Sequence, residues 1–235
     1  MNDLLLSEAM IARVFWTELR ASGCARDAAT DSNTAVLPHS QEVSKSFTHQ
    51  TGSISSQAAE LIWLLARYFQ PKSIAEVGTF IGRSTLALYM GARQTVEFLA
   101  TCDFSHNTWR APPTEAGDKI RYFGLTSSTQ MFQRLVEENR KIELFLFDGR
   151  IAPEDLDLIE QLATPQSVFI LDDFEGVEKG VVNALHLREK FKNYLLLAPD
   201  ASLETGWNAS NCLGVMLPAS SLRLSRQQRL PLSMM

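Results

Sequence analysis

The sequence predicts an α/β fold: a Rossmann-like, doubly wound, mostly parallel seven-stranded sheet with helices on both faces and an antiparallel C-terminal hairpin. Two observations predict this class. Short apolar runs alternate with amphipathic helical segments between residues 55 and 191, which is the pattern of parallel βαβ units. The last two apolar runs are joined by a loop without a helix, which favours an antiparallel pair at the sheet edge.

The N-terminal part of the chain is predicted to be separate from the main domain. Residues 1–53 would form a helix and a lid or arm segment, and residues 54–235 the main domain. Residues 3–22 carry apolar residues at helical spacing. We hypothesise that this helix packs across the interface of a homodimer; the alternative is that it caps its own sheet. Residues 23–53 are polar and long for a structureless loop, so we expect a lid or a partly disordered segment.

The main domain is predicted to begin with its clearest helix, at residues 55–70, whose apolar residues recur along one stripe until Pro71 ends the pattern. The segments that follow alternate between helix and strand. We predict further helices at 83–92, 128–141, 152–163 and 180–191. We predict strands at 73–78, 95–103, 119–126, 142–148, 167–173, 193–199 and 211–218.

Composition and charge argue against several classes of protein. The net charge of −5 is unlike that of nucleic-acid-binding proteins, which normally have a basic face. No apolar run approaches the roughly 20 residues that span a bilayer, so we expect no membrane association. The 3 cysteines are far apart and lack CxxC spacing, which indicates neither a disulfide framework nor a zinc site and favours a cytoplasmic protein.

Acidic residues lie at or near the ends of four predicted strands. They are Glu76, Asp103, Asp148 and the pair Asp172 and Asp173. The carboxyl ends of parallel strands meet at one sheet edge, where doubly wound folds bind their ligands. A single acid there can be a helix N-cap, but four in register indicate a site, because half-buried carboxylates need compensation.

A turn with two glycines follows the first predicted strand. Gly78 and Gly82 permit close approach of a ligand to the backbone, and the next helix offers free N–H groups to an anion. The nicotinamide fingerprint needs G-x-G-x-x-G, whereas three residues separate the glycines here. A carboxylate at Asp103 suits the two hydroxyls of a ribose, and Phe104 either covers a purine or packs in the core.

Five segments of the chain occur in a characteristic order: EVGTFIGRSTLAL, CDFS, GLTSS, LFLFDGR and FILDDFEG. On these motifs, residues 52–218 resemble a class I S-adenosylmethionine-dependent methyltransferase, most closely the small-molecule O-methyltransferase branch of the catechol and caffeoyl-CoA enzymes. The resemblance implies an enzyme that transfers a methyl group from S-adenosylmethionine to a small-molecule acceptor, at a hydroxyl oxygen.

The resemblance also implies which residues would contact the cofactor. The methionine end would be held by Glu76, Gly78, Thr79, Phe80, Gly82 and Ser84. The adenosine end would meet Asp103, Phe104, Thr126 and Ser127. Asp148 would lie next to the methyl donor, and residues 52–55 would close over the cofactor from the other side.

In the metal-dependent members of this branch, acids after the fourth and fifth strands bind a divalent cation. The corresponding residues are Asp148, Asp172 and Asp173, which would bind Mg²⁺ or another divalent cation. Hard cations prefer oxygen ligands, and converging carboxylates would repel one another without a cation. The metal would lower the pKa of the acceptor hydroxyl.

The chain departs from this branch at Ile151, where relatives carry a Lys or His base. Arg150 cannot replace the base because arginine does not deprotonate. His106 and His49 are the candidate catalytic bases, since their loops are expected to flank the strand ends. Three alternatives therefore stay open: N- or S-methylation without a metal, an NAD(P)-dependent oxidoreductase, and a non-catalytic member that binds the cofactor.

Overall fold

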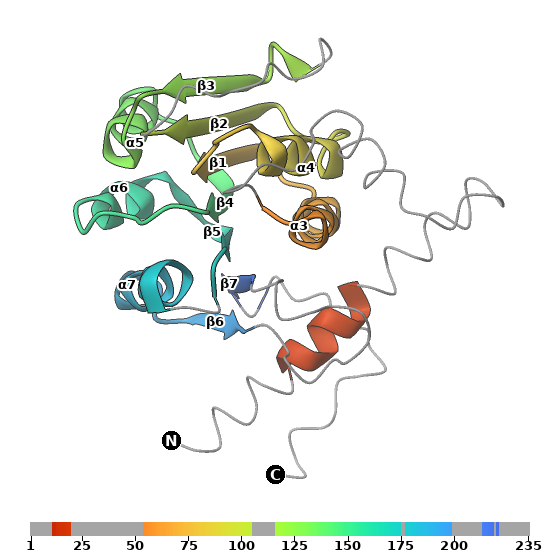
Figure 1. Cartoon of the computed structure of the whole chain (residues 1–235). Coiled ribbons are helices and arrows are strands. Elements are labelled where there is room, and N and C mark those ends of the chain that lie inside the picture. The colour runs from red at the N-terminus through yellow and green to blue at the C-terminus, as the bar shows by residue number, and fades with distance from the viewer. Residues whose placement is uncertain are drawn as a thin grey trace, which may run out of the picture.

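The computed structural model describes residues 11–19, 54–104, 116–174, 177–198, 213–218 and 220. Seven strands form one sheet in the order β3-β2-β1-β4-β5-β7-β6 (Figure 1). The strands are β1 (Ser73–Val77), β2 (Phe98–Asp103), β3 (Ile120–Gly124), β4 (Ile142–Phe147), β5 (Ala163–Leu171), β6 (Tyr194–Leu197) and β7 (Gly214–Pro218). The helices are α3 (Ser56–Phe69), α4 (Arg83–Gly91), α5 (Ser128–Glu137), α6 (Asp155–Leu162) and α7 (Val182–Lys190), with a π-helical turn η2 (Val177–Val181) before α7.

The predicted fold class is confirmed. Strands β3, β2, β1, β4 and β5 are parallel, whereas β7 pairs antiparallel with both β5 and β6. The last strand in sequence is therefore not the edge strand, because β7 inserts between β5 and β6. Local sequence could predict the hairpin but not which of its two strands would join β5.

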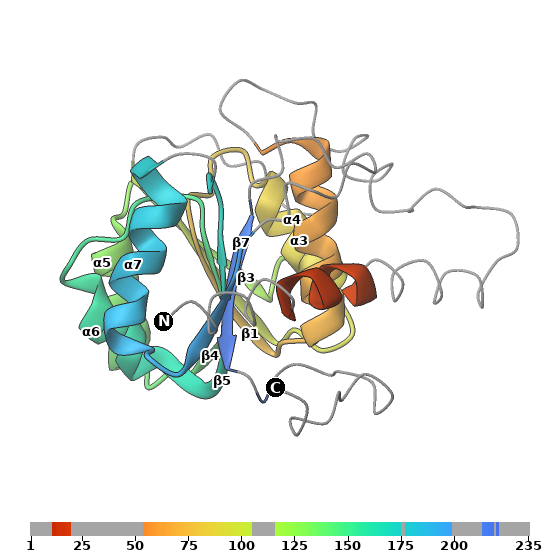
Figure 2. The ribbon, with the colours of Figure 1, turned by 90° about the horizontal axis from the view of Figure 1, so that it is seen from below.

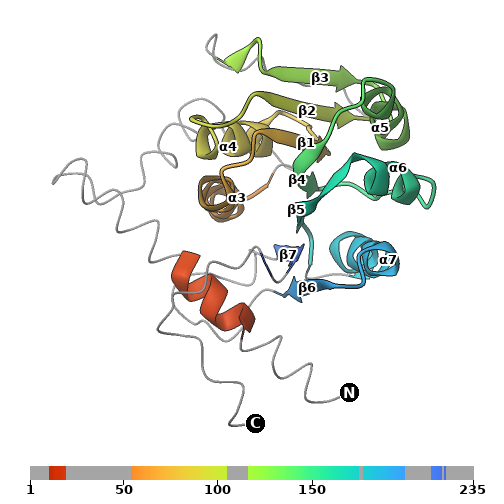
Figure 3. The same cartoon turned by 180° about the vertical axis from the view of Figure 1, so that it is seen from behind.

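Helices cover both faces of the sheet, as Figure 2 shows. Helices α5, α6 and α7 lie on one face, and α3, α4 and residues 11–19 lie on the other. The core has two main apolar layers, because strands buried on both faces carry apolar side chains in both directions. Figure 3 shows the same layers from behind. No helix among the described residues is both long enough and apolar enough to cross a membrane.

Residues 11–19 are the described part of the predicted N-terminal helix, and they are helical. Phe15, Trp16 and Leu19 are buried in the chain's own core. The Phe15 ring lies 5.8 Å from that of Tyr68 in α3, and Trp16 Nε1 donates to the carbonyl of Ala198 at 3.0 Å. The helix therefore packs on its own sheet, which is the second of the two alternatives given above. The homodimer stays a prediction.

The strand order creates a crevice at one edge of the sheet. The chain runs from β1 outward to β2 and β3, and then returns to place β4 on the other side of β1. The connections that leave β1 and β4 therefore diverge to opposite faces, which is the position where doubly wound sheets bind ligands. Gly78 follows β1 and Asp148 follows β4, so the two residues meet at this point.

Candidate functional site

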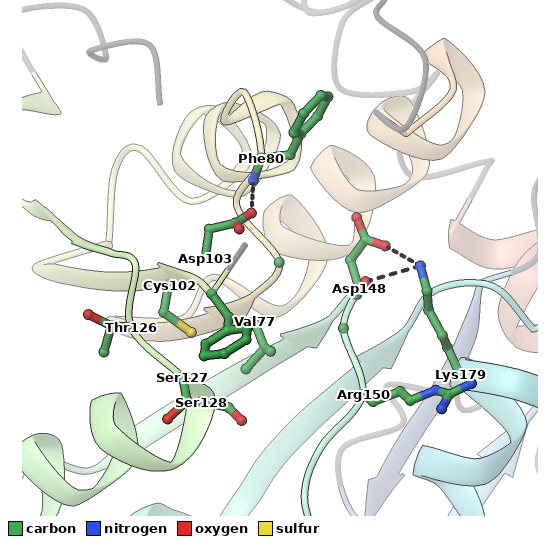
Figure 4. Close-up of a pocket in the computed structure, with 13 residues that line it drawn as sticks. Val77, Phe80, Cys102, Asp103, Thr126, Ser127, Ser128, Asp148, Arg150 and Lys179 are labelled. Atoms are coloured by element: carbon green, nitrogen blue, oxygen red, sulfur yellow. Dashed lines mark hydrogen bonds and ion pairs between the residues drawn. The ribbon is translucent and has the colours of Figure 1, made fainter. Parts of the chain in front are cut away.

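A cavity of about 600 Å³ opens at the carboxyl ends of β1, β2, β3 and β4 (Figure 4). Residues from five connections line it, although they are far apart in the sequence. They are Val77, Gly78, Phe80, Cys102, Asp103, Phe104, Thr126, Ser127, Ser128, Asp148, Gly149, Arg150 and Lys179. The sequence-predicted residues Gly78, Phe80, Asp103, Phe104, Thr126, Ser127 and Asp148 are thus brought together.

The turn after β1 forms one wall of the cavity. The amides of Gly78 and Thr79 donate to the carbonyl of Cys102 at 3.0 and 3.1 Å, which ties the turn to β2. Gly78 has a φ of +101°, and a Cβ there would lie 3.0 Å from the backbone carbon of Asp148. Glycine is required at this position for both reasons, and it leaves the backbone bare toward the cavity.

Glu76 lies below this turn and is fully buried. Its Oε2 accepts hydrogen bonds from Thr85 and, at 2.6 Å, from Thr101, while Ser84 also interacts with the carboxyl group. Burial raises the pKa of Glu76 to about 7, although these hydroxyl groups oppose the shift. Its Oε1 is buried and has no hydrogen-bond partner among the described residues, so it can accept one more donor.

Replacing Glu76 with glutamine should remove a pH dependence of stability. The folded-state pKa of about 7 exceeds the ordinary value of 4.5, so the unfolded chain releases this proton first as pH rises. The free energy of unfolding of the wild type should therefore fall between pH 4.5 and 7 by about 3 kcal/mol from this group. Urea denaturation of Glu76→Gln should lack that fall; parallel curves for the two proteins would contradict the assignment.

Asp103 ends β2 and faces the cavity. Its Oδ2 accepts the amide of Phe80 at 2.7 Å, so the turn after β1 holds the carboxylate in place (Figure 4). Phe80 reaches this position with a φ of +45°, an uncommon conformation for a residue with a side chain. A carboxylate fixed in this way at the second strand is suited to accept hydrogen bonds from vicinal hydroxyls.

The outer part of the cavity carries Phe104, Thr126 and Ser127. The side chain of Phe104 is 75% exposed. It is therefore available to a ligand, which is the first of our two interpretations, and is not packed in the core. The amide of Thr126 donates to the carbonyl of Asp103 at 3.0 Å. The Ser127 hydroxyl caps α5 in a capping box with Gln130, so its first role is structural.

Asp148 follows β4 and faces the cavity from the opposite side to Asp103. Its amide donates to the carbonyl of Val77 at 2.9 Å, which extends the pairing of β1 and β4. Burial and the neighbouring Asp172 raise the pKa of Asp148 well above its ordinary value, and the Lys179 ammonium opposes that shift. The carboxyl group is partly buried, with 17% of the side chain exposed at the cavity.

The predicted metal ligands do not form a metal site in this structure. Lys179 Nζ lies 2.5 Å from Asp173 Oδ2, 3.5 Å from the Asp148 carbonyl and 3.8 Å from Asp148 Oδ1. Among the described residues, no group of three or more His, Cys, Asp or Glu side chains could hold a metal ion. The converging negative charge that Asp148, Asp172 and Asp173 were expected to share with Mg²⁺ is compensated here by an ammonium. The donor set therefore does not fit a divalent cation.

The position of the missing base does not face the cavity. Ile151 is buried in the apolar layer beneath the sheet, and its amide donates to Asn183 Oδ1 at 3.2 Å. Asn183 also donates to the carbonyl of Gly149 at 2.8 Å, which fixes the connection after β4. The candidate bases His106 and His49 lie outside the described residues, and both stay predictions. His186, in α7, does not line the cavity.

Lys179 was not among the site residues predicted from the sequence. It lies in η2, several residues after the acid pair that follows β5 and immediately before the predicted helix at 180–191. Its position depends on Gly180, because a Cβ there would lie 2.4 Å from the carbonyl oxygen of Asp172. A Lys-Gly pair shortly after FILDD was the available signal, since the glycine lets the chain return directly over the acids.

Comparisons with known proteins give a shared fold. No protein-family model matches the sequence, and no curated protein matches it. The O-methyltransferase from Bacillus cereus, solved in complex with SAH, has a TM-score of 0.53 and 15% identity; the match covers 84% of this chain and 97% of that one. The O-methyltransferase TomG from Streptomyces achromogenes, involved in tomaymycin synthesis and solved with SAM, has a TM-score of 0.52 and 14% identity, with 84% and 96% covered.

The chain therefore has a Rossmann-like methyltransferase fold over most of its length. The resemblance stated from the five motifs is confirmed at the level of the fold. At such low identity, the similarity does not carry the acceptor or the metal from those proteins to this one.

Proposed function

We propose that the protein is an S-adenosylmethionine-dependent methyltransferase that acts on a hydroxyl oxygen of a small molecule. One observation carries the proposal: a single cavity joins a bare glycine turn after β1, a fixed carboxylate at the end of β2 and a second carboxylate after β4. A sulfonium cofactor with an amino-acid end and a ribose needs these three features. A cavity of about 600 Å³ is also within the size range of small-molecule sites.

In this proposal, residues of β1 and α4 hold the amino-acid end of the cofactor. The turn from Gly78 to Gly82, with Thr79 and Phe80, approaches it with bare backbone, and the N-terminus of α4 favours its carboxylate. The Oε1 of Glu76, which has no hydrogen-bond partner among the described residues, would accept a donor such as the ammonium group of the cofactor. Ser84 lies at the same helix end, and its hydroxyl would turn from Glu76 to donate a hydrogen bond to the carboxylate.

The adenosine part would extend toward β2 and β3. Asp103 accepts the ribose hydroxyls, Phe104 packs on the adenine ring, and Thr126 and Ser127 border its edge. Asp148 then lies on the side of the cavity where the methyl group would be presented. The cofactor supplies an electrophilic methyl group, and the protein contributes alignment of the donor with the acceptor oxygen and exclusion of water.

The acceptor would enter beside Asp148, where the side chains of Arg150 and Lys179 form the other rim of the cavity. Methylation of oxygen is proposed over nitrogen because a cation beside the acceptor stabilises an oxyanion, whereas it would repel a protonated amine. A thiolate would be stabilised in the same way, so S-methylation stays the alternative. The divalent cation expected from the resemblance is not carried into the proposal, since Lys179 already pairs with Asp148 and Asp173.

Calorimetry tests the cofactor directly. S-adenosylmethionine and its product S-adenosylhomocysteine should bind one to one with micromolar affinity, whereas NADH and NADPH should give no heat above dilution. The physical reason is the G-x-x-x-G turn, which lacks the third glycine of the dinucleotide fingerprint. Binding of NADH in preference to S-adenosylhomocysteine would favour the oxidoreductase alternative and overturn the proposal. Cofactor binding without methylation of any compound in a hydroxyl-bearing panel would favour the non-catalytic alternative.

A further inference from the structure

Lys179 provides a positive charge inside the cavity, next to acids on the connections after β4 and β5. Its Nζ contacts Asp173 Oδ2 at 2.5 Å and lies within 3.8 Å of both the carbonyl and the carboxylate of Asp148. Figure 4 shows the Lys179 side chain reaching up from below to the Asp148 oxygens. The two acids that the ammonium joins come after different strands, β4 and β5.

The local backbone is shaped to put the ammonium there. Lys179 lies in the π-helical turn η2, and such turns occur frequently at functional sites. The next residue, Gly180, packs directly on the carbonyl of Asp172, where a Cβ would clash at 2.4 Å. Asp173 has a φ of +55°, which costs conformational energy in a residue other than glycine. Strain at Asp173 and close packing at Gly180 both serve to bring Lys179 over the strand ends.

We propose that Lys179 is a catalytic residue that takes the place of a divalent cation by binding the acceptor oxygen beside Asp148. The inference rests on the proposed function. An ammonium has three N–H donors, and two of them are used by Asp173 Oδ2 at 2.5 Å and the Asp148 carbonyl at 3.5 Å, because Asp148 Oδ1 at 3.8 Å is beyond hydrogen-bond distance. One donor is therefore available toward the cavity that Lys179 lines.

The ammonium would do part of the work of a metal ion. A donated hydrogen bond and a nearby positive charge both favour the deprotonated form of an acceptor hydroxyl, which lowers its pKa. The hydroxyl proton leaves to solvent, which reaches the ammonium beside Asp173, whose side chain is 40% exposed. The oxyanion then takes the methyl group as the carbon–sulfur bond breaks, and the electron pair of that bond stays on the sulfur of S-adenosylhomocysteine. This arrangement also accounts for Ile151, which lies on the connection after β4. A chain that activates its acceptor from the connection after β5 and from η2 does not need a base at position 151.

Binding of Mn²⁺ distinguishes an internal cation from a metal site, and it can be measured without a known acceptor. The test uses electron paramagnetic resonance on the full chain with saturating S-adenosylhomocysteine. Wild type should bind Mn²⁺ only at millimolar concentration. Lys179→Ala, which leaves the acids without their cation, should bind it at least about tenfold more tightly. Lys179→Met serves the same purpose if the alanine variant does not fold.

Two variants act as controls. Lys179→Arg keeps the charge and should bind Mn²⁺ as weakly as wild type. Lys190→Ala removes a lysine that also pairs with two acids, Asp157 and Glu160, but lies outside the cavity, so it should leave Mn²⁺ binding unchanged. Wild-type affinity equal to that of Lys179→Ala, whether both are strong or both are weak, would overturn the inference.

The same samples separate this inference from the proposed function. If S-adenosylhomocysteine does not bind, the proposed function fails, and the Mn²⁺ titrations without it still report whether Lys179 occupies a cation position. If S-adenosylhomocysteine binds and the Lys179 variants do not alter Mn²⁺ affinity, only the role of Lys179 fails. Once an acceptor is known, Lys179→Met should lower kcat at least tenfold with little change in cofactor affinity, whereas a chelator should leave wild-type turnover unchanged.

Discussion

Replacing Asp103 with alanine is expected to weaken S-adenosylhomocysteine binding about 100-fold, with a smaller effect on stability. The carboxylate ends β2 at the cavity wall and is oriented by the Phe80 amide at 2.7 Å. A ribose diol would donate two hydrogen bonds to it, and bonds to a charged group contribute about 1.5–3 kcal/mol each. The loss of both corresponds to about two to four orders of magnitude in Kd, and the expected 100-fold is the lower end of that range. Calorimetric titration of both proteins measures it.

Two further variants show whether the effect belongs to the ribose contact. Asp103→Asn keeps an oxygen for the Phe80 amide and for one hydroxyl, so its affinity should fall between those of wild type and Asp103→Ala. Asp118→Ala removes an exposed aspartate outside the cavity and should bind like wild type. An unchanged affinity in Asp103→Ala would remove Asp103 from the site, and with it the proposed orientation of the cofactor along β2.

The acids at the strand ends show how far sequence alone could define this site. Alternation of apolar runs and helices predicts the parallel sheet, and parallel strands necessarily bring their carboxyl ends to one edge. Asp103 and Asp148 were placed in the cavity by that reasoning. Glu76 was grouped with them, but it lies one residue before the end of β1 and is fully buried under the turn. Whether a side chain at a strand end is buried or faces the cavity depends on strand register, because a shift of one residue moves the side chain to the other face of the sheet.

Lys179 and Ile151 show why the rest could not be predicted. Both residues lie in connections after strands. The periodic spacing of apolar residues, which shows the buried face of a regular helix or strand, gives no side-chain direction there. Ile151 faces the apolar layer because Asn183 fixes its backbone from α7, a contact between residues 32 positions apart. Lys179 faces the acids because a π-helical turn replaces the regular start of the predicted helix at 180–191. These two tertiary contacts put an ammonium beside the acids and an apolar side chain at position 151.

Replacing Gly78 with alanine should reduce S-adenosylhomocysteine affinity by more than tenfold. The added Cβ would lie 3.0 Å from the backbone carbon and 3.2 Å from the Cβ of Asp148, so the connections after β1 and β4 would have to separate. The φ of +101° adds backbone strain of about 1–3 kcal/mol for a residue with a side chain. Both effects move the bare backbone that the amino-acid end of the cofactor is proposed to contact.

Gly91→Ala is the matched comparison, because it makes the same chemical change at an even more crowded position away from the cavity. Its Cβ would lie 2.4 Å from the carbonyl oxygen of Trp63, where α4 packs on α3. Overpacking there should lower the free energy of unfolding by about 1–3 kcal/mol while the folded protein binds S-adenosylhomocysteine normally. Calorimetry at a temperature where both variants are folded separates the two cases. Equal affinity in Gly78→Ala and Gly91→Ala would mean that Gly78 only relieves crowding between strands. A loss confined to Gly78→Ala would mean that its missing side chain is what admits the cofactor.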